Sequence, residues 1–377
     1  KNKMADITAI DMHNITSAEE VMNIIETSAS ALMKNPELAT SLPAIMLRGA
    51  PGVGKSTIVR TVTEKLGIGF IDVRLAQMER VDFAGLPSIN NGMTEWNVPS
   101  FWPRDMKSNG IILLDEITSA PSDCQVAAYS VVLDRRIPNS NYVLPNGWLI
   151  VAAGNRTCDR AAVKTMSSAL ANRFVHFEVE ANSEDWVKWA IMNNINPAVV
   201  GFINFRPGLL FKMEGQNLEQ GWPSPRSWER VSNSIKMFNG NSNIMRKVVY
   251  GLIGNSVGLE FMEFYKMSSE FDSILEIMLD EKKEFVLPEK ADKRYAISSA
   301  VIYHLWNGED DTEQRVNGFY KILMKMPSDF AAMMIRAAML GNKKVKAMDA
   351  MRMIMTNKNY ANAAKLFANA SANIGTL

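Results

Sequence analysis

Short apolar segments alternate with amphipathic or polar stretches through the first half of the chain. Each segment has the length of a buried strand, and the stretches between them have helical or loop character. The segments are Ile45–Leu47, Gly69–Leu75, Ile111–Leu114, Trp148–Ala153 and Val175–Val179. This alternation predicts an α/β fold in which five parallel strands are joined by crossover helices.

Helical patterns lie on both sides of these segments. Ser17 and Glu20 are spaced as a capping box, and apolar residues follow at helical spacing, which predicts a helix over 17–34. From Trp186 onward strand-like runs disappear, and helical periodicity is interrupted by proline and glycine clusters. We therefore predict an α/β nucleotide-binding domain with an N-terminal helix over 1–185, a helical lid domain over 186–267 and a helical extension over 268–377.

Composition restricts the class of protein. A chain of 377 residues with 47% hydrophobic content has room for two or three domains with real cores. The net charge of +1 gives no overall bias toward nucleic acid or anionic membranes. The cysteines, Cys124 and Cys158, are too few for a disulfide scaffold. No apolar run approaches the length of a membrane span and no signal-peptide core is evident, so we expect a cytoplasmic protein.

The segment from Gly49 to Ser56 matches the pattern G-x-x-x-x-G-K-[ST] of a phosphate-binding loop. A predicted strand precedes it and a predicted helix follows it, which is the context that this motif requires. Glycines let the backbone wrap around a polyphosphate, Lys55 can reach the β- and γ-phosphates, and Ser56 can ligate Mg²⁺. The residues expected to bind the nucleotide are Gly49, Ala50, Pro51, Gly52, Val53, Gly54, Lys55, Ser56 and Thr57.

Two acidic residues, Asp115 and Glu116, end the third apolar segment. At the carboxyl edge of a parallel sheet they lie beside the phosphate loop. Asp115 is expected to hold Mg²⁺ directly or through water, and Glu116 to orient and deprotonate the attacking water. Alone, such a pair is also common at ordinary strand ends.

Three further polar residues are candidates for the same chemistry. Asn155 follows the fourth segment and can bridge the γ-phosphate and the water, although asparagine also forms turns there. Arg173 precedes the fifth segment and can neutralise charge on the phosphate of a neighbouring subunit, although surface arginines are common. Arg226 opens a helix of the second domain and can report nucleotide state, with Arg230 as its local competitor.

In this order, the motifs resemble those of the AAA+ ATPases, and specifically the MoxR-type branch. The resemblance covers about 40–240. It implies that the phosphate loop is Walker A, Asp115-Glu116 is Walker B, Asn155 is sensor 1, Arg173 is the arginine finger and Arg226 is sensor 2. It also implies a P-loop core with strand order 5-1-4-3-2, an all-α lid, ATP and Mg²⁺ as cofactors, and a hexameric ring.

Two segments lie where this family carries insertions. Asp82–Pro103 corresponds to its helix-2 insert, and Ile137–Gly147 to a hairpin before sensor 1. The first insert contains three large aromatic residues, which either pin the loop to the core or grip a substrate: Trp96, Phe101 and Trp102. Other arginines near the predicted finger leave its assignment open: Arg135, Arg136, Arg156 and Arg160.

The leading hypothesis is therefore an Mg²⁺-dependent ATPase that forms rings and remodels or activates a client protein. The resemblance implies a partner with a von Willebrand factor A domain, which would be a separate chain. One alternative is a motor or loader acting on nucleic acid, which the near-neutral net charge disfavours but the basic tail from Gly341 to Leu377 leaves open. Salt-sensitive stimulation by DNA or RNA would support it. Another is a nucleotide-stabilised scaffold, for which Glu116 would have no use.

Overall fold

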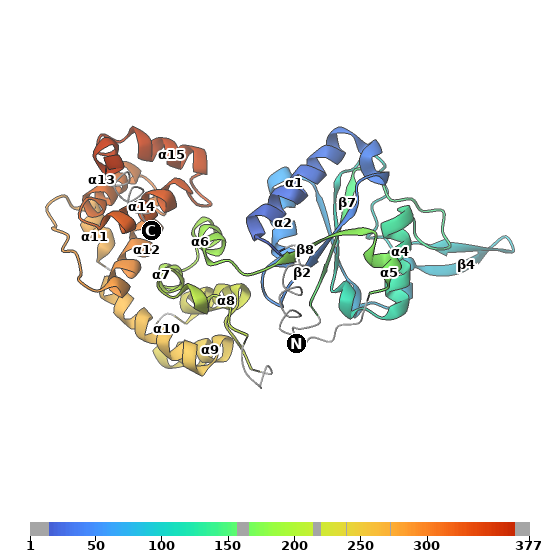
Figure 1. Ribbon diagram of the computed structural model, residues 1–377, viewed down its shortest axis with the longest axis horizontal. Helices are drawn as coiled ribbons and strands as arrows, with labels where there is room; N and C mark the ends of the chain where they lie inside the picture. Colours follow the sequence, from blue (N-terminus) through green and yellow to red (C-terminus); the bar gives the residue numbers. More distant parts are fainter. Residues whose placement is uncertain (1–14, 157–165, 214–219, 239, 272, 366–377) are drawn as a thin grey trace, which may run out of the picture. The chain divides into compact units, whose positions relative to one another are not determined.

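The computed structural model describes residues 15–156, 166–213, 220–238, 240–271 and 273–365; Cys158 and Arg160 lie outside these ranges. The chain divides into two compact units, Lys1–Glu180 and Ala181–Leu377. The described part of the first unit combines strands and helices, and that of the second is helical (Figure 1). Among the described residues, every helix is too short or too polar to cross a lipid bilayer.

A parallel sheet forms the centre of the first unit. The strands are β1 (Ile15–Thr16), β2 (Ala44–Arg48), β3 (Gly69–Arg74), β4 (Leu86–Asn90), β5 (Met93–Asn97), β6 (Gly110–Asp115), β7 (Trp148–Gly154) and β8 (Phe174–Val179). Six of them pair in the order β1-β8-β2-β7-β6-β3, and β4 and β5 form a separate antiparallel hairpin.

The five strands from β8 to β3 confirm the predicted order 5-1-4-3-2, but the predicted number of strands in the sheet is wrong by one. The additional strand, β1, pairs in parallel with the edge of β8, with Ile15 opposite Glu178. A strand of two residues carries no hydrophobic periodicity, so the sequence pattern does not reveal it.

Helices cover both faces of this sheet (Figure 1). They are α1 (Ala18–Lys34), α2 (Lys55–Leu66), α3 (Arg80–Ala84), α4 (Ser122–Asp134) and α5 (Ser168–Ala171). Since both faces are covered, β2, β6 and β7 are buried along nearly their whole length and read as continuous apolar runs. Helix α1 begins at the predicted capping box, in which Ser17 and Glu20 each accept a hydrogen bond from the other's backbone N–H.

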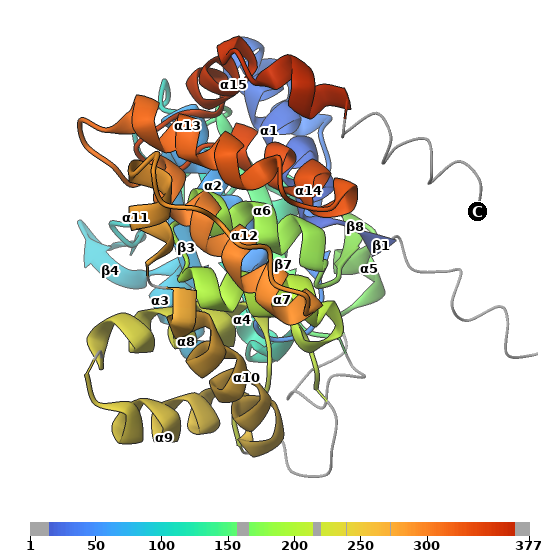
Figure 2. The same cartoon turned by 90° about the vertical axis from the view of Figure 1, so that its left-hand side faces the viewer.

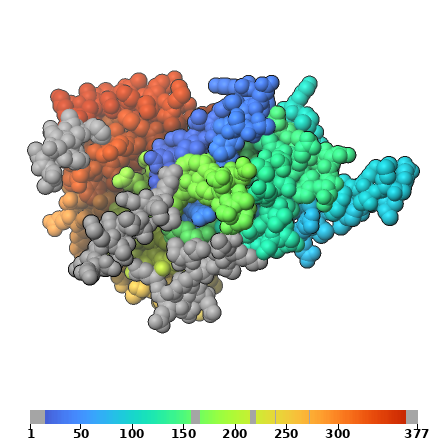
Figure 3. All heavy atoms as spheres, turned by 45° about the vertical axis from the view of Figure 1, so that its right-hand side comes forward, coloured from blue at the N-terminus to red at the C-terminus, as the bar shows by residue number. Residues whose placement is uncertain are grey.

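The first predicted insert consists of α3 and the β4–β5 hairpin, which projects from the surface of the first unit (Figure 3). Trp102 closes the insert: its side chain is 1% exposed, its Nε1 donates to the carbonyl oxygen of Phe83 at 3.0 Å, and its ring packs edge-on against Phe83. For Trp102 the pinning role is the one that the structure shows. The second predicted insert contains one isolated antiparallel bridge, Arg136 to Val143, rather than a hairpin of two strands.

The second unit consists of helices that pack in antiparallel and crossed pairs (Figure 2). They are α6 (Ser183–Met192), α7 (Pro197–Phe205), α8 (Pro225–Met237), α9 (Ser242–Ile253), α10 (Asn255–Ser268), α11 (Ile274–Leu279), α12 (Ala291–Trp306), α13 (Thr312–Leu323), α14 (Ser328–Met339) and α15 (Ala347–Thr356). Helix α12 lies beside α7, and Gly201 permits the close approach, because a Cβ there would lie 3.1 Å from the carbonyl oxygen of Tyr295.

Apolar side chains of this unit gather in two clusters. The first helical cluster comes mainly from α6 to α10 and includes Trp228 and Phe261, and the second comes mainly from α11 to α15 and includes Phe319. Helix α12 contributes to both, through Ala296 and Ile297 respectively. The division between the two compact units falls between Glu180 and Ala181 along the chain. The domain boundaries after residues 185 and 267 stay predictions.

Replacing Trp102 by alanine tests its role as the anchor of the insert. The change removes a fully buried ring and a buried hydrogen bond, so we expect a loss of about 3–5 kcal/mol in the free energy of unfolding. Urea denaturation measures this loss. Trp96→Ala, on the partly exposed hairpin, is the matched control, and an equal effect of the two changes would contradict the anchoring role.

Candidate nucleotide site

The phosphate-binding loop connects the end of β2, at Arg48, to the start of α2, at Lys55. Gly52 and Gly54 have φ angles of 84° and 102°, in the region that favours glycine. Gly49 is required for a different reason, because a Cβ there would collide with the carbonyl oxygen of Val179 on β8. The glycines of the motif therefore permit both the turn of the loop and its close approach to the sheet.

The N-terminus of α2 opens onto this loop. Its N-cap is Gly54, and no side chain caps the helix. The first-turn N–H groups of a helix have no partner within the helix and carry part of the positive end of its dipole. An anion such as a phosphate group fits this end of α2.

Lys55 is the first residue of α2, and its side chain folds back over the loop. It is 8% exposed, and its Nζ donates to the carbonyl oxygens of Gly49 at 2.7 Å and Ala50 at 3.1 Å. It also donates to Oδ1 of Asn155 at 3.2 Å. A buried ammonium group must be satisfied by such acceptors, and phosphate oxygens can replace them.

Ser56 and Asp115 form the next contact of the site. The Ser56 hydroxyl donates to Oδ2 of Asp115 at 2.6 Å, and the other carboxylate oxygen accepts from the backbone N–H of Glu116 at 2.8 Å. Glu116 has a left-handed backbone with φ of 57°, and its side chain is exposed. The carboxylate of Asp115 is therefore fixed, while that of Glu116 is accessible to solvent.

Asn155 lies directly after β7, and Thr118 holds its backbone. The Asn155 N–H donates to Oγ1 of Thr118 at 3.1 Å, while its side-chain oxygen accepts from Lys55. Thr118 is 4% exposed, and nothing in the sequence distinguished it from an ordinary turn residue. Asn155 thus connects the central strand to the phosphate loop.

The donor set fits Mg²⁺ better than a transition metal. Mg²⁺ takes one or two protein oxygens and keeps water or phosphate oxygens as its other ligands, and Ser56 with Asp115 supplies such oxygens. No group of three or more His, Cys, Asp and Glu side chains that could hold a metal occurs in the described part of the chain.

Asp72, in the middle of β3, is a further acidic residue near this site that the sequence analysis did not single out. Burial, and then the charge of Asp115, raise the pKa of its carboxyl group, and Arg74 and Arg60 lie 3.6 and 3.9 Å from its Oδ2. Within the described residues its Oδ1 is buried and has no hydrogen-bond partner. In the sequence, the signal that could have identified Asp72 is an acidic residue within an otherwise apolar strand segment.

The arginines near the predicted finger have different surroundings. Arg173 is exposed, and no ion pair of its side chain occurs among the described residues. Arg156 is tied to its own chain, 2.7 Å from Glu178 and 3.6 Å from Glu180. Arg135 is buried, which lowers its pKa to about 10, and it donates to the carbonyl oxygens of Pro145 and Trp148. Of the other two, Arg136 is exposed and Arg160 lies outside the described residues.

Arg226 belongs to the second unit, at the second position of α8. Its side chain is exposed, as is that of Arg230 one turn later. The role of Arg226 at the phosphates stays a prediction.

Comparison with known sequences shows which domain family and which proteins this chain is similar to. Residues 44–174 match the AAA domain of the dynein-related subfamily. Lon protease 2 of Borreliella burgdorferi is 26% identical over 143 residues, 38% of this chain and 18% of the relative. Lon protease of Metamycoplasma arthritidis is 29% identical over 102 residues, 27% and 12% of the two chains. The chain thus spans less than a fifth of the length of these relatives.

Some solved structures are also similar to this chain, at lower sequence identity. A RuvB variant of Thermotoga maritima is 16% identical, with a TM-score of 0.37 over 78% of this chain and 86% of that chain. A putative ATPase from Cytophaga hutchinsonii is 14% identical, with a TM-score of 0.32 over 76% and 80%. TM-scores this low carry no argument about function. The family match and the order of the five strands from β8 to β3 identify a P-loop AAA+ fold.

The stability of two arginine variants separates a structural from a surface role. Arg156→Ala removes the ion-pair partner of Glu178, whose side chain is 11% exposed, so we expect a loss of about 1–3 kcal/mol in unfolding free energy. Arg173→Ala is expected to change it by less than about 0.5 kcal/mol. Chemical denaturation of both variants measures the difference. A larger loss of stability in Arg173→Ala than in Arg156→Ala would contradict a surface role for Arg173.

Proposed function

Since residues 44–174 of this chain match an AAA domain in a P-loop AAA+ fold, we propose that the protein is an Mg²⁺-dependent ATPase of the MoxR type. In this proposal it forms a ring and uses ATP hydrolysis to remodel or activate a partner protein. The observation that carries the catalytic part is a pair of side-chain hydrogen bonds at one edge of the sheet. It links Lys55 to Asn155, and Ser56 to Asp115.

Binding of a triphosphate exchanges one set of contacts for another. Lys55 leaves the carbonyl oxygens of Gly49 and Ala50 for phosphate oxygens, so its charge is never without an acceptor. Ser56 and Asp115 would hold Mg²⁺, which when bound neutralises charge on the phosphates. Asn155, anchored through Thr118, orients the attacking water.

Glu116 is the proposed general base. It lies one residue beyond the fixed carboxylate of Asp115, and its own side chain is exposed. A carboxylate in this position accepts the proton of the attacking water, as transfer of a phosphoryl group to water requires.

Arg173 is the proposed finger for the site of a neighbouring subunit. Its exposure supports this role, because a cation that acts on another subunit must reach beyond its own chain. The ion pairs of Arg156 make that residue a weaker candidate. Ring formation follows from such a shared site, and a hexamer is the form that we propose; Arg226 would couple the second unit to the nucleotide.

We favour a client protein over nucleic acid. The relatives named above are Lon proteases, and the formal net charge of this chain is +1. Phosphate contacts dominate binding to nucleic acid and require clustered positive charge. A separate protein with a von Willebrand factor A domain remains the partner implied by the MoxR resemblance.

Glu116→Gln tests the proposed base. The change removes the proton acceptor and leaves the phosphate loop intact, so we expect ATP binding within about twofold of the parent and a fall in turnover of at least about 100-fold. Phosphate release and equilibrium binding of a fluorescent ATP analogue measure the two quantities. Glu95→Gln, on the exposed hairpin, is the matched control; undiminished turnover in Glu116→Gln would refute the assignment.

Mixing two inactive variants tests whether a site is shared between subunits. Arg173→Ala keeps its own phosphate loop, and Lys55→Ala keeps its arginine, so a mixed ring contains some complete sites. Each variant alone is expected to show no hydrolysis, and the mixture a measurable fraction of the parent rate. Absence of recovery in rings shown by native mass spectrometry to contain both variants would exclude sharing through Arg173.

A further inference from the structure

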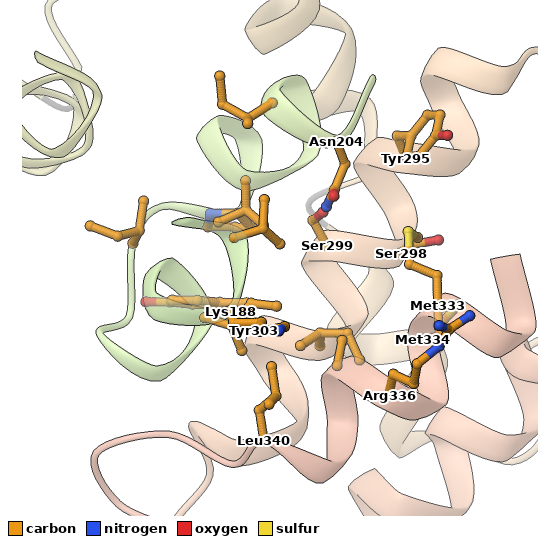
Figure 4. A pocket seen from close by; sticks show the side chains of 18 of the residues that line it. Lys188, Asn204, Tyr295, Ser298, Ser299, Tyr303, Met333, Met334, Arg336 and Leu340 are labelled. Carbon is orange, nitrogen blue, oxygen red and sulfur yellow. The ribbon is translucent and has the colours of Figure 1, made fainter. Parts of the chain in front are cut away.

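A cavity of about 470 Å³ lies within the second unit, remote in sequence from the phosphate-binding motifs. Its walls come from α6, α7, α12 and α14, and Figure 4 shows their side chains around it. The first two helices belong to the first helical cluster and α14 to the second, so the cavity lies where the two clusters meet. Its volume is in the range of small-molecule sites.

Most of the lining is apolar, but one buried hydroxyl has no partner. The apolar part comes from all four helices and includes Val187, Ile203, Ile302 and Met334. Ser298 lines the same cavity; it is 1% exposed, and its Oγ has no hydrogen-bond partner among the described residues. Leaving a buried hydroxyl without a partner costs free energy, and a ligand with a polar atom beside it removes that cost.

The walls are held in place without a ligand. Asn342 forms one end of the cavity and donates to the carbonyl oxygen of Trp306 at 3.2 Å and to Asn194 at 3.3 Å. Asn194 has a left-handed backbone with a φ of 54°, and its side-chain oxygen accepts the hydrogen bond from Asn342. These contacts tie the α6–α7 turn to the end of α12 and to the residues after α14, so the cavity is preformed.

The charge of the lining is positive. Of the charged residues around the cavity, Lys188 and Arg336 are basic and Glu184 is acidic. Lys188 also lies 3.6 Å from Asp185, and Arg336 also donates to the carbonyl oxygen of Ala332 at 3.3 Å. Neutral polar groups complete the lining: Figure 4 shows Asn204 extending from α7 toward Ser299 on α12.

We propose that this cavity binds a small amphiphilic anion, an aliphatic carboxylate in its simplest form. The aliphatic part fills the space between the apolar side chains, and the carboxylate interacts with the basic residues of the lining. Ser298 donates its hydroxyl proton to an oxygen of the ligand. Such a ligand contacts both helical clusters at once and stabilises their packing against each other.

Three probes that share a ten-carbon chain separate the effect of charge from that of apolar burial. The full chain is titrated by isothermal calorimetry with decanoate, decanol and decyltrimethylammonium, each below its aggregation concentration. We expect saturable binding of one decanoate per chain, with the cation at least about tenfold weaker. Failure of decanoate to bind, or equal binding of the anion and the cation, would overturn the proposal.

Variants then locate the binding. Ala337→Phe and Val187→Phe fill the cavity from opposite walls, and each is expected to abolish decanoate binding; two variants guard against one that does not fold. Ser298→Ala is expected to weaken binding about fivefold without lowering the thermal stability of the free protein. Binding that survives in both folded filling variants would place the ligand elsewhere and refute the site.

A charge variant and its control complete the test. Arg336→Gln is expected to weaken decanoate about tenfold, while Arg246→Gln, on α9 and not lining the cavity, has no effect. Lys55→Ala is expected to bind decanoate as the parent does, so this proposal stands or falls independently of the ATPase. If both glutamine variants lost decanoate affinity equally, the overall charge of the protein would explain the loss, and the proposed contact with Arg336 would be contradicted.

Discussion

Parallel pairing of β7 between β2 and β6 is the constraint on which the nucleotide site depends. The register places Arg48 opposite Gly154, and Leu114 opposite Ala152, so the three strands end at the same edge of the sheet. The phosphate loop follows β2 directly, Asn155 follows β7, and Asp115 is the last residue of β6. Since both faces are buried, a slip in this register would place side chains of other sizes against the covering helices and disrupt the close packing. The positions of the catalytic groups thus follow from the core.

Within this frame, the site holds its charges without nucleotide. Lys55 is nearly buried and is satisfied by carbonyl oxygens of its own loop, while Ser56 and Asp115 satisfy each other. Nucleotide binding in the proposed mechanism therefore exchanges contacts rather than creating them, and little reorganisation is required. Glu116 and Arg173 differ from this group, since both are exposed. Their proposed roles concern a water molecule and a neighbouring subunit, which are outside the packed site.

The helical unit has a different organisation. Its apolar side chains form two clusters that meet along α12, and the cavity described above occupies part of their junction. Helices α7 and α12 pack closely at Gly201, and the hydroxyl of Ser298, which lines the cavity, has no partner among the described residues. A packed interior rarely leaves a polar group in this condition, which is why the proposed ligand has a polar atom as well as an apolar chain.

The sequence by itself determined the parts that rest on local chemistry. Five strands of the sheet, the capping box at Ser17 and the phosphate loop follow from periodicity, turn residues and a motif whose glycines have a local reason. Family resemblance supplied the strand order. Only the tertiary structure decided which distant groups meet: that Thr118 anchors Asn155, that Arg156 pairs with Glu178, and that β1 extends the sheet. It also placed Ser298 beside a cavity. These contacts join residues far apart in the chain, and their side chains carry no local pattern that distinguishes them from ordinary surface or core positions.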